Sequence, residues 1–177
     1  MQMRYSDVNE LHYEKIGSFW GRLAVFLFFA VTLLFAGLYF YQRLHGPLGD
    51  KPSPDWFYIM MAGIFLLIGI LTLNFFTLTI HVTTEGLTAA YGIFKQYIPW
   101  DNVAGYEMGK GTSLLNYGGY GIRFGYKKGG PVLVYNIMGA KLIMLELRAP
   151  GRFKYFAFST RHPEEVAALV EKWANPE

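Results

Sequence analysis

The chain has 177 residues, of which 53% are hydrophobic and only 16% are charged. Globular chains carry about 25% charged residues, so this composition favours a membrane protein. The sequence contains no cysteine, which excludes disulfides, thiolate catalysis and zinc or iron–sulfur sites built from cysteine. The formal net charge of +3 is too small to indicate nucleic-acid binding, which needs clustered basic residues on one face.

The first long apolar run lies between Arg22 and Arg43, with no charged residue between them. About 20 apolar residues suffice to cross a hydrocarbon core of about 30 Å, so we expect a transmembrane helix over about residues 20–42. Trp20 and Tyr41, near the two ends, fit the aromatic belts of a membrane interface. A cleaved signal peptide needs a shorter apolar core and a cleavage site of small residues, which this bulky run does not show.

A second uncharged run extends from Trp56 to Ile80 and is also long enough to span, over about residues 56–76. The segment between the two runs contains glycines and prolines that break a helix and form a tight polar loop. The two spans therefore predict a helical hairpin at residues 19–80. We assign residues 1–18 to an N-terminal juxtamembrane segment that precedes it.

The basic residues around the hairpin predict its orientation. Arg4, Lys15 and Arg22 flank the side that carries the termini, whereas Arg43 and Lys51 flank the loop. The positive-inside rule places the more basic side in the cytoplasm. We therefore expect a multi-pass integral protein of the plasma (inner) membrane whose N- and C-termini are both cytoplasmic.

After the second span, apolar residues alternate with polar ones, which is typical of a half-buried β-strand. In TLTIHVT, Leu78, Ile80 and Val82 alternate with threonine and histidine. The pattern that follows predicts about seven strands in a domain at residues 77–177, separated by turns rich in glycine and proline. The final segment, HPEEVAALVEKWA, predicts an amphipathic helix with Pro163 in its first turn.

The segment NYGGYGIRFGYKKGG, at residues 116–130, is rich in glycine and tyrosine. Its glycines do not match G-x-G-x-x-G, because Phe124 stands at the last glycine position, and no Gly-Lys-Ser/Thr follows as in a phosphate-binding loop. Ile122, Phe124 and Tyr126 share one face of an alternating strand, and a glycine-rich turn follows. The segment therefore predicts a loop and a β-hairpin rather than a phosphate site.

Several motifs after the second span resemble those of bacterial and archaeal pleckstrin-homology-like (PH-like) domains attached to membrane hairpins. Those domains carry a T-x-x-G-L turn, a strand ending in glycine, a hydrophobic residue and phenylalanine, and an I-P-W-x-x-V segment. The matching residues here are Thr83, Gly86, Leu87, Gly92, Ile93, Phe94, Ile98, Pro99, Trp100 and Val103. The resemblance implies an α+β membrane protein in which two transmembrane helices precede a PH-like antiparallel β barrel or sandwich of about seven strands, capped by one C-terminal α-helix.

No pattern in the sequence indicates catalysis or metal binding. The histidines are His12, His45, His81 and His162, which are not paired at metal-ligand spacing, and H-E-x-x-H is absent. Ser113 does not lie in a G-x-S-x-G motif. We therefore expect a protein that is not an enzyme, with no catalytic residues, no cofactor and no metal site.

The expected function is that of a binding or assembly module, which contacts a protein partner or a second copy of itself at the surface of the lipid bilayer. The predicted partner contacts are apolar residues in a long glycine-rich loop, namely Leu114, Leu115, Tyr117 and Tyr120. Two alternatives stay open: recognition of anionic lipid headgroups, and service as an accessory subunit of a membrane enzyme complex. The predicted headgroup contacts lie at two hairpin turns and are Lys127, Lys128, Arg152 and Lys154.

Overall fold

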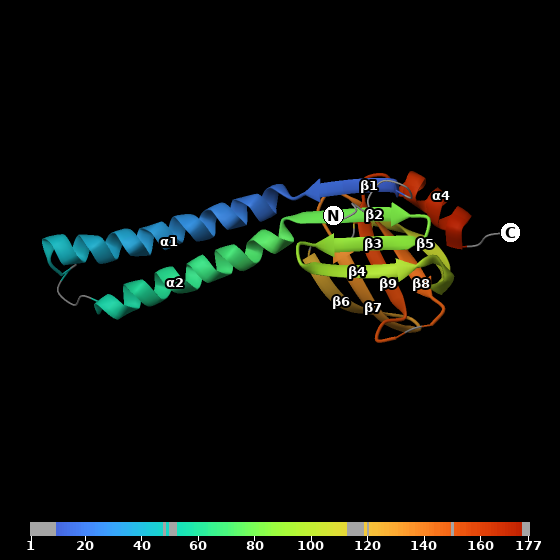
Figure 1. The fold of residues 1–177 in the computed structure, drawn as a ribbon. Helices are drawn as coiled ribbons and strands as arrows, with labels where there is room; N and C mark the ends of the chain where they lie inside the picture. The colour runs from blue at the N-terminus through green and yellow to red at the C-terminus, as the bar shows by residue number, and fades with distance from the viewer. Residues whose placement is uncertain are drawn as a thin grey trace, which may run out of the picture. The chain divides into compact units, whose positions relative to one another are not determined.

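A computed structural model of the chain describes residues 10–47, 49, 53–112, 119, 121–149 and 151–174 (Figure 1). The chain divides into two units. One is a helical hairpin, Phe19–Phe76, and the other is a β unit made of Met1–Ser18 together with Thr77–Glu177. The helical hairpin is therefore inserted, in sequence, between two stretches of the β unit.

The helical hairpin consists of α1 (Phe19–His45), α2 (Asp55–Thr72) and the short 3-10 helix η1 (Leu73–Phe75). Both long helices have the length and the apolar composition that crossing a membrane requires. At 1.5 Å per residue, α1 is about 40 Å long and α2 about 27 Å. These bounds confirm the two predicted apolar helices and their hairpin arrangement.

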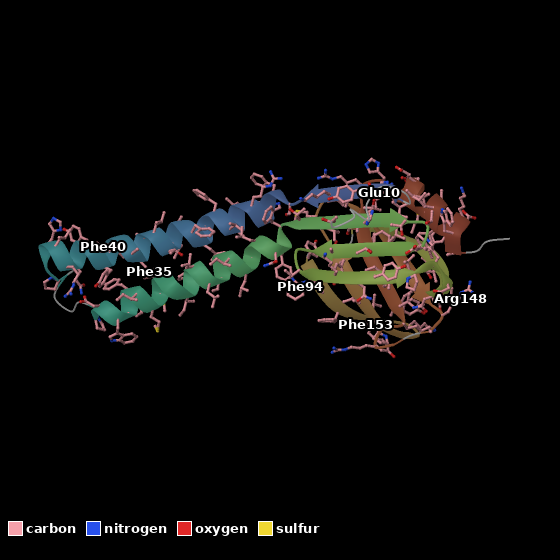
Figure 2. The ribbon with its side chains drawn as sticks, viewed as in Figure 1. Glu10, Phe35, Phe40, Phe94, Arg148 and Phe153 are labelled. Carbon is pink, nitrogen blue, oxygen red and sulfur yellow. The ribbon has the colours of Figure 1, made fainter. Side chains whose placement is uncertain are left out.

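Aromatic rings and one glycine pack α1 against α2, and Figure 2 shows Phe35 among the side chains between them. The Phe35 ring stacks on Phe65, with ring centroids 5.9 Å apart, and meets Phe57 edge-on at 6.2 Å. Gly69 lies so close to α1 that a Cβ at this position would stand 3.3 Å from the Cβ of Phe28. Close packing of this kind, rather than the hydrophobic effect, holds helices together in lipid.

The described residues of the β unit form nine strands in two sheets, followed by helix α4 (Pro163–Ala174). Sheet A has the order β1-β2-β3-β4 and is antiparallel throughout. Sheet B has the order β5-β8-β9-β7-β6, in which β7 and β9 are parallel. The strands of sheet A are β1 (Glu10–Gly17), β2 (Thr77–Thr83), β3 (Gly86–Tyr91) and β4 (Phe94–Pro99). Those of sheet B are β5 (Val103–Thr112), β6 (Gly121–Lys127), β7 (Gly130–Asn136), β8 (Lys141–Leu147) and β9 (Tyr155–Thr160).

The β unit confirms the predicted α+β class and the C-terminal helix. It differs from the prediction of about seven antiparallel strands, because its described residues form nine strands and include one parallel pair. Among the described residues, both sheets are open and neither closes into a barrel. The parallel pair arises because the β8–β9 hairpin lies between β5 and β7, so that β9 runs beside β7 in the same direction. Alternation within a strand carries no information about which distant strand it will pair with.

The residues just before α1 belong to the β unit and do not form the separate juxtamembrane segment that we expected. They form β1, which pairs with β2 from Gly17 opposite Thr77 to Glu10 opposite Thr83. Its buried side chains include an acid, Glu14, as well as the aliphatic Ile16. Because one inward position is charged, the strand lacks the apolar alternation that would have revealed it.

The main core lies between the two sheets. Sheet A contributes fully buried side chains at alternate positions of β2, such as Leu78 and Val82. The Tyr91 ring at the end of β3 stacks on Tyr135 of sheet B, with centroids 5.9 Å apart. The Tyr91 hydroxyl also donates to the carbonyl oxygen of Asn136 at 2.5 Å. One tyrosine thus joins the two sheets by both a ring contact and a hydrogen bond.

The opposite face of sheet B is also apolar at its centre. A second cluster of buried side chains lies there: Val132, Val134, Leu142, Met144, Tyr155 and Ala157. Burial on both faces explains why β7, β8 and β9 are nearly continuous apolar runs instead of alternating ones. Two members of this cluster, Met144 and Tyr155, also line the pocket described below.

Helix α4 packs its predicted apolar stripe against the β unit. It contacts β5, β8 and the 3-10 helix η2 (Trp100–Asn102). Val166 and Val170 are fully buried on this side. Glu164 in the first turn is hydrogen-bonded by the backbone N–H at the helix start and pairs with Lys141 at 3.1 Å, and both interactions lower the pKa of its carboxyl group.

Candidate functional site

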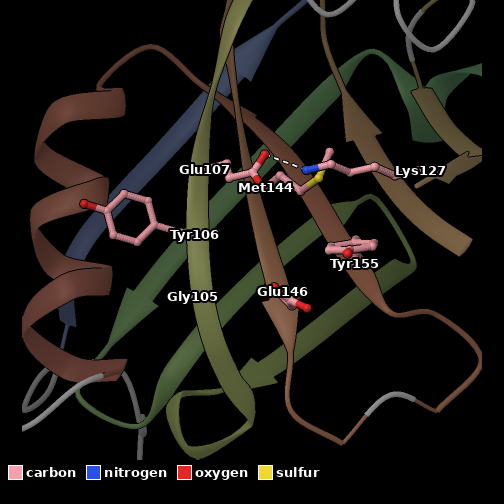
Figure 3. Close-up of a pocket in the computed structure, with 7 residues that line it drawn as sticks. All are labelled: Gly105, Tyr106, Glu107, Lys127, Met144, Glu146 and Tyr155. Atoms are coloured by element: carbon pink, nitrogen blue, oxygen red, sulfur yellow. Dashed lines mark hydrogen bonds and ion pairs between the residues drawn. The ribbon is translucent and has the colours of Figure 1, made fainter. Parts of the chain in front are cut away.

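A pocket of about 130 Å³ opens on sheet B. Strand β5 and the end of β6 stand on either side of it, and β8 and β9 lie behind (Figure 3). The lining residues are Gly105, Tyr106, Glu107, Lys127, Met144, Glu146 and Tyr155. This volume is below the roughly 300 Å³ at which pockets for drug-sized ligands begin.

The charged groups at this pocket neutralise one another. Lys127 Nζ lies 2.5 Å from Glu107 Oε2, and Lys154 Nζ lies 3.4 Å from Glu146 Oε1. Both ammonium groups also stand over the ring of Tyr155, at 5.2 and 5.5 Å from its centroid. The hydrogen bond to Glu146 raises the pKa of Lys154, because it stabilises the charged ammonium form. The structure thus brings Lys127 and Lys154 together, each with a carboxylate partner.

The other two residues expected at lipid headgroups have different surroundings. Lys128 is exposed in the turn between β6 and β7, and Arg152 is exposed in the loop before β9. Neither forms an ion pair with an acidic residue in the part of the chain that the structure describes. The Arg152 guanidinium instead lies 5.6 Å from the ring centroid of Phe153 and 5.9 Å from that of Phe124.

Beside Arg152, aromatic side chains project into solvent from the edge of sheet B. Phe124 is 69% exposed and Tyr126 is 79% exposed, and both lie on the edge strand β6. The Phe124 ring stacks on Phe153 with centroids 5.6 Å apart. We call Phe124, Tyr126, Arg152 and Phe153 the aromatic edge. Large exposed rings grouped on one edge are typical of an interaction surface.

The predicted partner contacts Leu114, Leu115, Tyr117 and Tyr120 all lie outside the described residues. The aromatic edge comes from the strand and loop that follow them. Alternation in the sequence predicts Phe124 and Tyr126 on one face of a strand, but it does not single them out as contacts. The overlooked signal was that these large aromatic residues lie in a short hairpin, one strand of which often forms the edge of a sheet.

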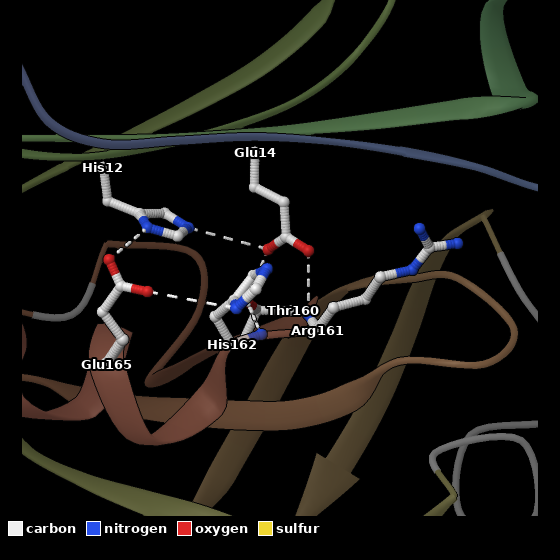
Figure 4. A network of polar contacts seen from close by, with 6 residues as sticks. All are labelled: His12, Glu14, Thr160, Arg161, His162 and Glu165. Carbon is white, nitrogen blue, oxygen red and sulfur yellow. Dashed lines mark hydrogen bonds and ion pairs between the residues drawn. The ribbon is translucent and has the colours of Figure 1, made fainter.

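At the opposite side of the β unit, a polar network joins β1 to the start of α4 (Figure 4). The buried Glu14 carboxylate accepts a hydrogen bond from the Thr160 hydroxyl at 2.6 Å and another from the Arg161 backbone N–H at 3.0 Å. His12 Nδ1 lies 3.0 Å from Glu165 Oε1. Figure 4 shows the side chains of His12 and Glu14 directed toward this region from β1.

This network contains histidines and carboxylates but is not arranged as a metal site. Within the described ranges, no group of three His, Asp or Glu side chains is placed to hold a metal ion. His12 and His162 meet as an edge-on ring pair, with centroids 5.8 Å apart. The Glu14 oxygens are occupied by donors of the chain, so the network ties β1 to the C-terminal part of the β unit.

Comparison with known proteins gave no relative: no protein-family model, no curated protein and no solved structure matches this chain.

Proposed function

We propose that this chain is a two-span membrane protein whose β unit is a non-enzymatic binding module for a partner protein. The observation that carries the proposal is the aromatic edge, which combines exposed rings and a cation with an edge strand, β6, that has no further strand beside it among the described residues. Partner strands add to open sheet edges through main-chain hydrogen bonds, and side-chain pockets supply the specificity. The partner would then present an extended segment along β6.

The charge of the aromatic edge indicates the chemistry of that segment. Arg152 stands over the Phe124 and Phe153 rings, and Lys128 is exposed at the end of β6. Neither is ion-paired with a described acidic residue, so a carboxylate from outside would meet no competing acid there. We therefore propose a partner segment that carries both an apolar or aromatic side chain and an acidic one.

The two apolar helices support the membrane assignment. Because β1 and β2 are paired, the chain leaves the β unit and returns to it at adjacent strands, as a hairpin that crosses twice requires. Lys15 and Arg22 flank these ends, and Arg43 lies near the loop. The positive-inside rule again favours cytoplasmic termini and a plasma (inner) membrane location.

The resemblance to PH-like domains fits part of the β unit. Thr83 Oγ1 accepts hydrogen bonds from the backbone N–H groups of Glu85 and Gly86, which shapes the T-x-x-G turn. The indole N–H of Trp100, in the I-P-W segment, donates to the carbonyl oxygen of Thr83 at 2.9 Å. These contacts support a PH-like assignment for the motif region, and the helix that follows sheet B agrees with it.

Recognition of anionic lipid is the second candidate, because Lys128 and Arg152 are both exposed and lack an acidic partner among the described residues. It is less well supported, since the other two expected cations are held by Glu107 and Glu146. A role as an accessory subunit of a membrane enzyme complex is one form of the partner proposal, in which the partner is the catalytic chain.

The test is to purify the intact protein from its native membrane in mild detergent and to measure the particle mass and its companions. Phe124→Ser combined with Tyr126→Ser should remove a companion that the unaltered protein retains. The matched control is Tyr13→Ser, because Tyr13 is a 54% exposed aromatic on β1, an edge strand of sheet A. A companion that survives the double substitution, or a particle made of this chain alone, contradicts the proposal.

A further inference from the structure

One end of sheet A is where the chain passes into and out of the helical hairpin. β1 ends at Gly17, β2 begins at Thr77, and these two residues are paired. Leu78 of β2 is in turn paired with Tyr91, the last residue of β3. The turn between β3 and β4 therefore lies at this same end of the sheet.

The connections between the sheet and the helices are very short. Ser18 alone separates β1 from α1, and Phe76 alone separates η1 from β2. Consecutive Cα atoms are 3.80 Å apart, so two peptide steps reach at most about 7.6 Å. If the two helices cross a bilayer, this end of sheet A stays close to the bilayer surface whatever angle the helices take.

The turn at this end presents apolar side chains to solvent. Gly92 has a φ of 52°, in the left-handed region that glycine adopts without strain. The next residue, Ile93, is 76% exposed, more than any other large aliphatic side chain described in the β unit. Phe94 follows at 44% exposure, and Lys95 after it is also exposed.

The turn at the opposite end of the same sheet has the reverse character. Between β2 and β3, Thr83 Oγ1 accepts hydrogen bonds from the N–H groups of Glu85 and Gly86 at 3.3 and 3.2 Å. Glu85 is exposed there. One sheet thus has an acidic turn at one end, and at the end joined to the helices a turn with an isoleucine, a phenylalanine and a lysine.

We propose that the β3–β4 turn inserts Ile93 and Phe94 into the interfacial layer of the bilayer that α1 and α2 cross. Apolar side chains at this depth gain from leaving water, and Lys95 can stay among the headgroups. The turn is then a third attachment that restrains how far the β unit can swing about its two short connections. This inference rests on the two-span part of the proposed function and is independent of the aromatic edge.

The test uses single cysteines in the intact protein, since the natural chain has none. A fluorescent label is placed at Ile93→Cys, at Glu85→Cys in the opposite turn, or at Gly37→Cys on α1, where a Cβ meets no atom within 4 Å. Each protein is reconstituted into phosphatidylcholine–phosphatidylglycerol vesicles. For each label, fluorescence quenching by brominated lipid is then compared with quenching by aqueous iodide, which is supplied on both sides of the bilayer.

The inference predicts that the label at position 93 is quenched by brominated lipid and protected from iodide, while the label at position 85 behaves in the opposite way. A label at 93 that is quenched only by iodide, or that is shielded from both quenchers, overturns the inference. In either case, quenching of the label at 37 by lipid leaves the two-span assignment intact. If iodide quenches the label at position 37, the two-span assignment fails, and the inference fails with it.

Discussion

Two edge strands of the β unit, β1 and β6, differ in whether their characteristic side chains are buried or exposed. On β1, the inward carboxylate of Glu14 is buried and takes hydrogen bonds from Thr160 and from the backbone of Arg161. On β6, the rings of Phe124 and Tyr126 are more than two-thirds exposed. On β1 the buried carboxylate is hydrogen-bonded within the chain, whereas on β6 large apolar side chains are exposed to solvent.

This difference suggests that β1 contributes mainly to the stability of the fold and β6 mainly to the binding of a partner. A buried carboxylate with two donors contributes to folding and offers little to a partner, because its acceptor sites are taken. Exposed rings on an edge strand contribute little to folding, and they favour association because contact with a partner removes their apolar surface from water. Substitutions at β1 should therefore change stability, and substitutions at β6 should change binding.

The largest expected effect is at Glu14. Glu14→Ala leaves the Thr160 hydroxyl and the Arg161 N–H without their acceptor, so the free energy of unfolding should fall by about 3 kcal/mol. Glu14→Gln keeps one acceptor oxygen and should cost less. Denaturant unfolding of the intact protein in detergent, followed by near-ultraviolet circular dichroism, measures both. An unchanged midpoint for Glu14→Ala would mean that the network does not hold β1.

A smaller effect is expected at Thr160, whose hydroxyl donates to Glu14 and accepts from the His162 N–H. Thr160→Val keeps the shape and should lower the free energy of unfolding by about 2 kcal/mol. Combined with Glu14→Ala, it should cost less than the sum of the two single changes, because both remove the same hydrogen bond. Strictly additive costs in the same unfolding assay would show that the two side chains act independently.

The charge of the aromatic edge should matter less again. Arg152→Gln should weaken binding of the co-purified companion by about 1 kcal/mol, or roughly fivefold, and should make binding less dependent on salt. Lys172→Gln is the matched control, since Lys172 is an exposed cation 5.6 Å from the Trp173 ring on α4. Titration of the companion at two salt concentrations measures both variants, and equal losses would show a general charge effect.

The smallest expected effect is on folding at β6 itself. Tyr126→Ser should change the free energy of unfolding by no more than about 0.5 kcal/mol, since the ring is 79% exposed. The unfolding assay used for Glu14 serves here too. A loss of several times this size would show that Tyr126 packs within the chain and would remove the contrast between the two edges.

The parts of the fold that were predictable are those with a local signal. Two uncharged runs gave the helices, and period-two alternation in TLTIHVT gave β2. Strand β1 was missed because Glu14 stands at a buried position and its partner strand begins some 60 residues later, beyond the helical hairpin. The parallel pairing of β7 with β9 was missed for a similar reason, since strand pairing over such distances leaves no local pattern.

The candidate site was predictable only in part. The sequence placed Lys127 and Lys154 at turns but could not show that Glu107 and Glu146 reach them, because these acids come from other strands of the curved sheet. It also placed Phe124 and Tyr126 on one face without revealing that β6 is an edge. Exposure on a strand depends on the neighbouring strands, and that is a property of the folded sheet.

The most direct test of the central claim is a photo-crosslink from the aromatic edge in native membranes. A benzophenone amino acid replaces Phe124 in one variant and Tyr13 in another, and the membranes are irradiated before extraction. We predict a light-dependent covalent adduct between position 124 and another polypeptide, and none from position 13. Adducts from position 124 to lipid alone, or no adduct at all, would contradict the claim that this edge binds a protein.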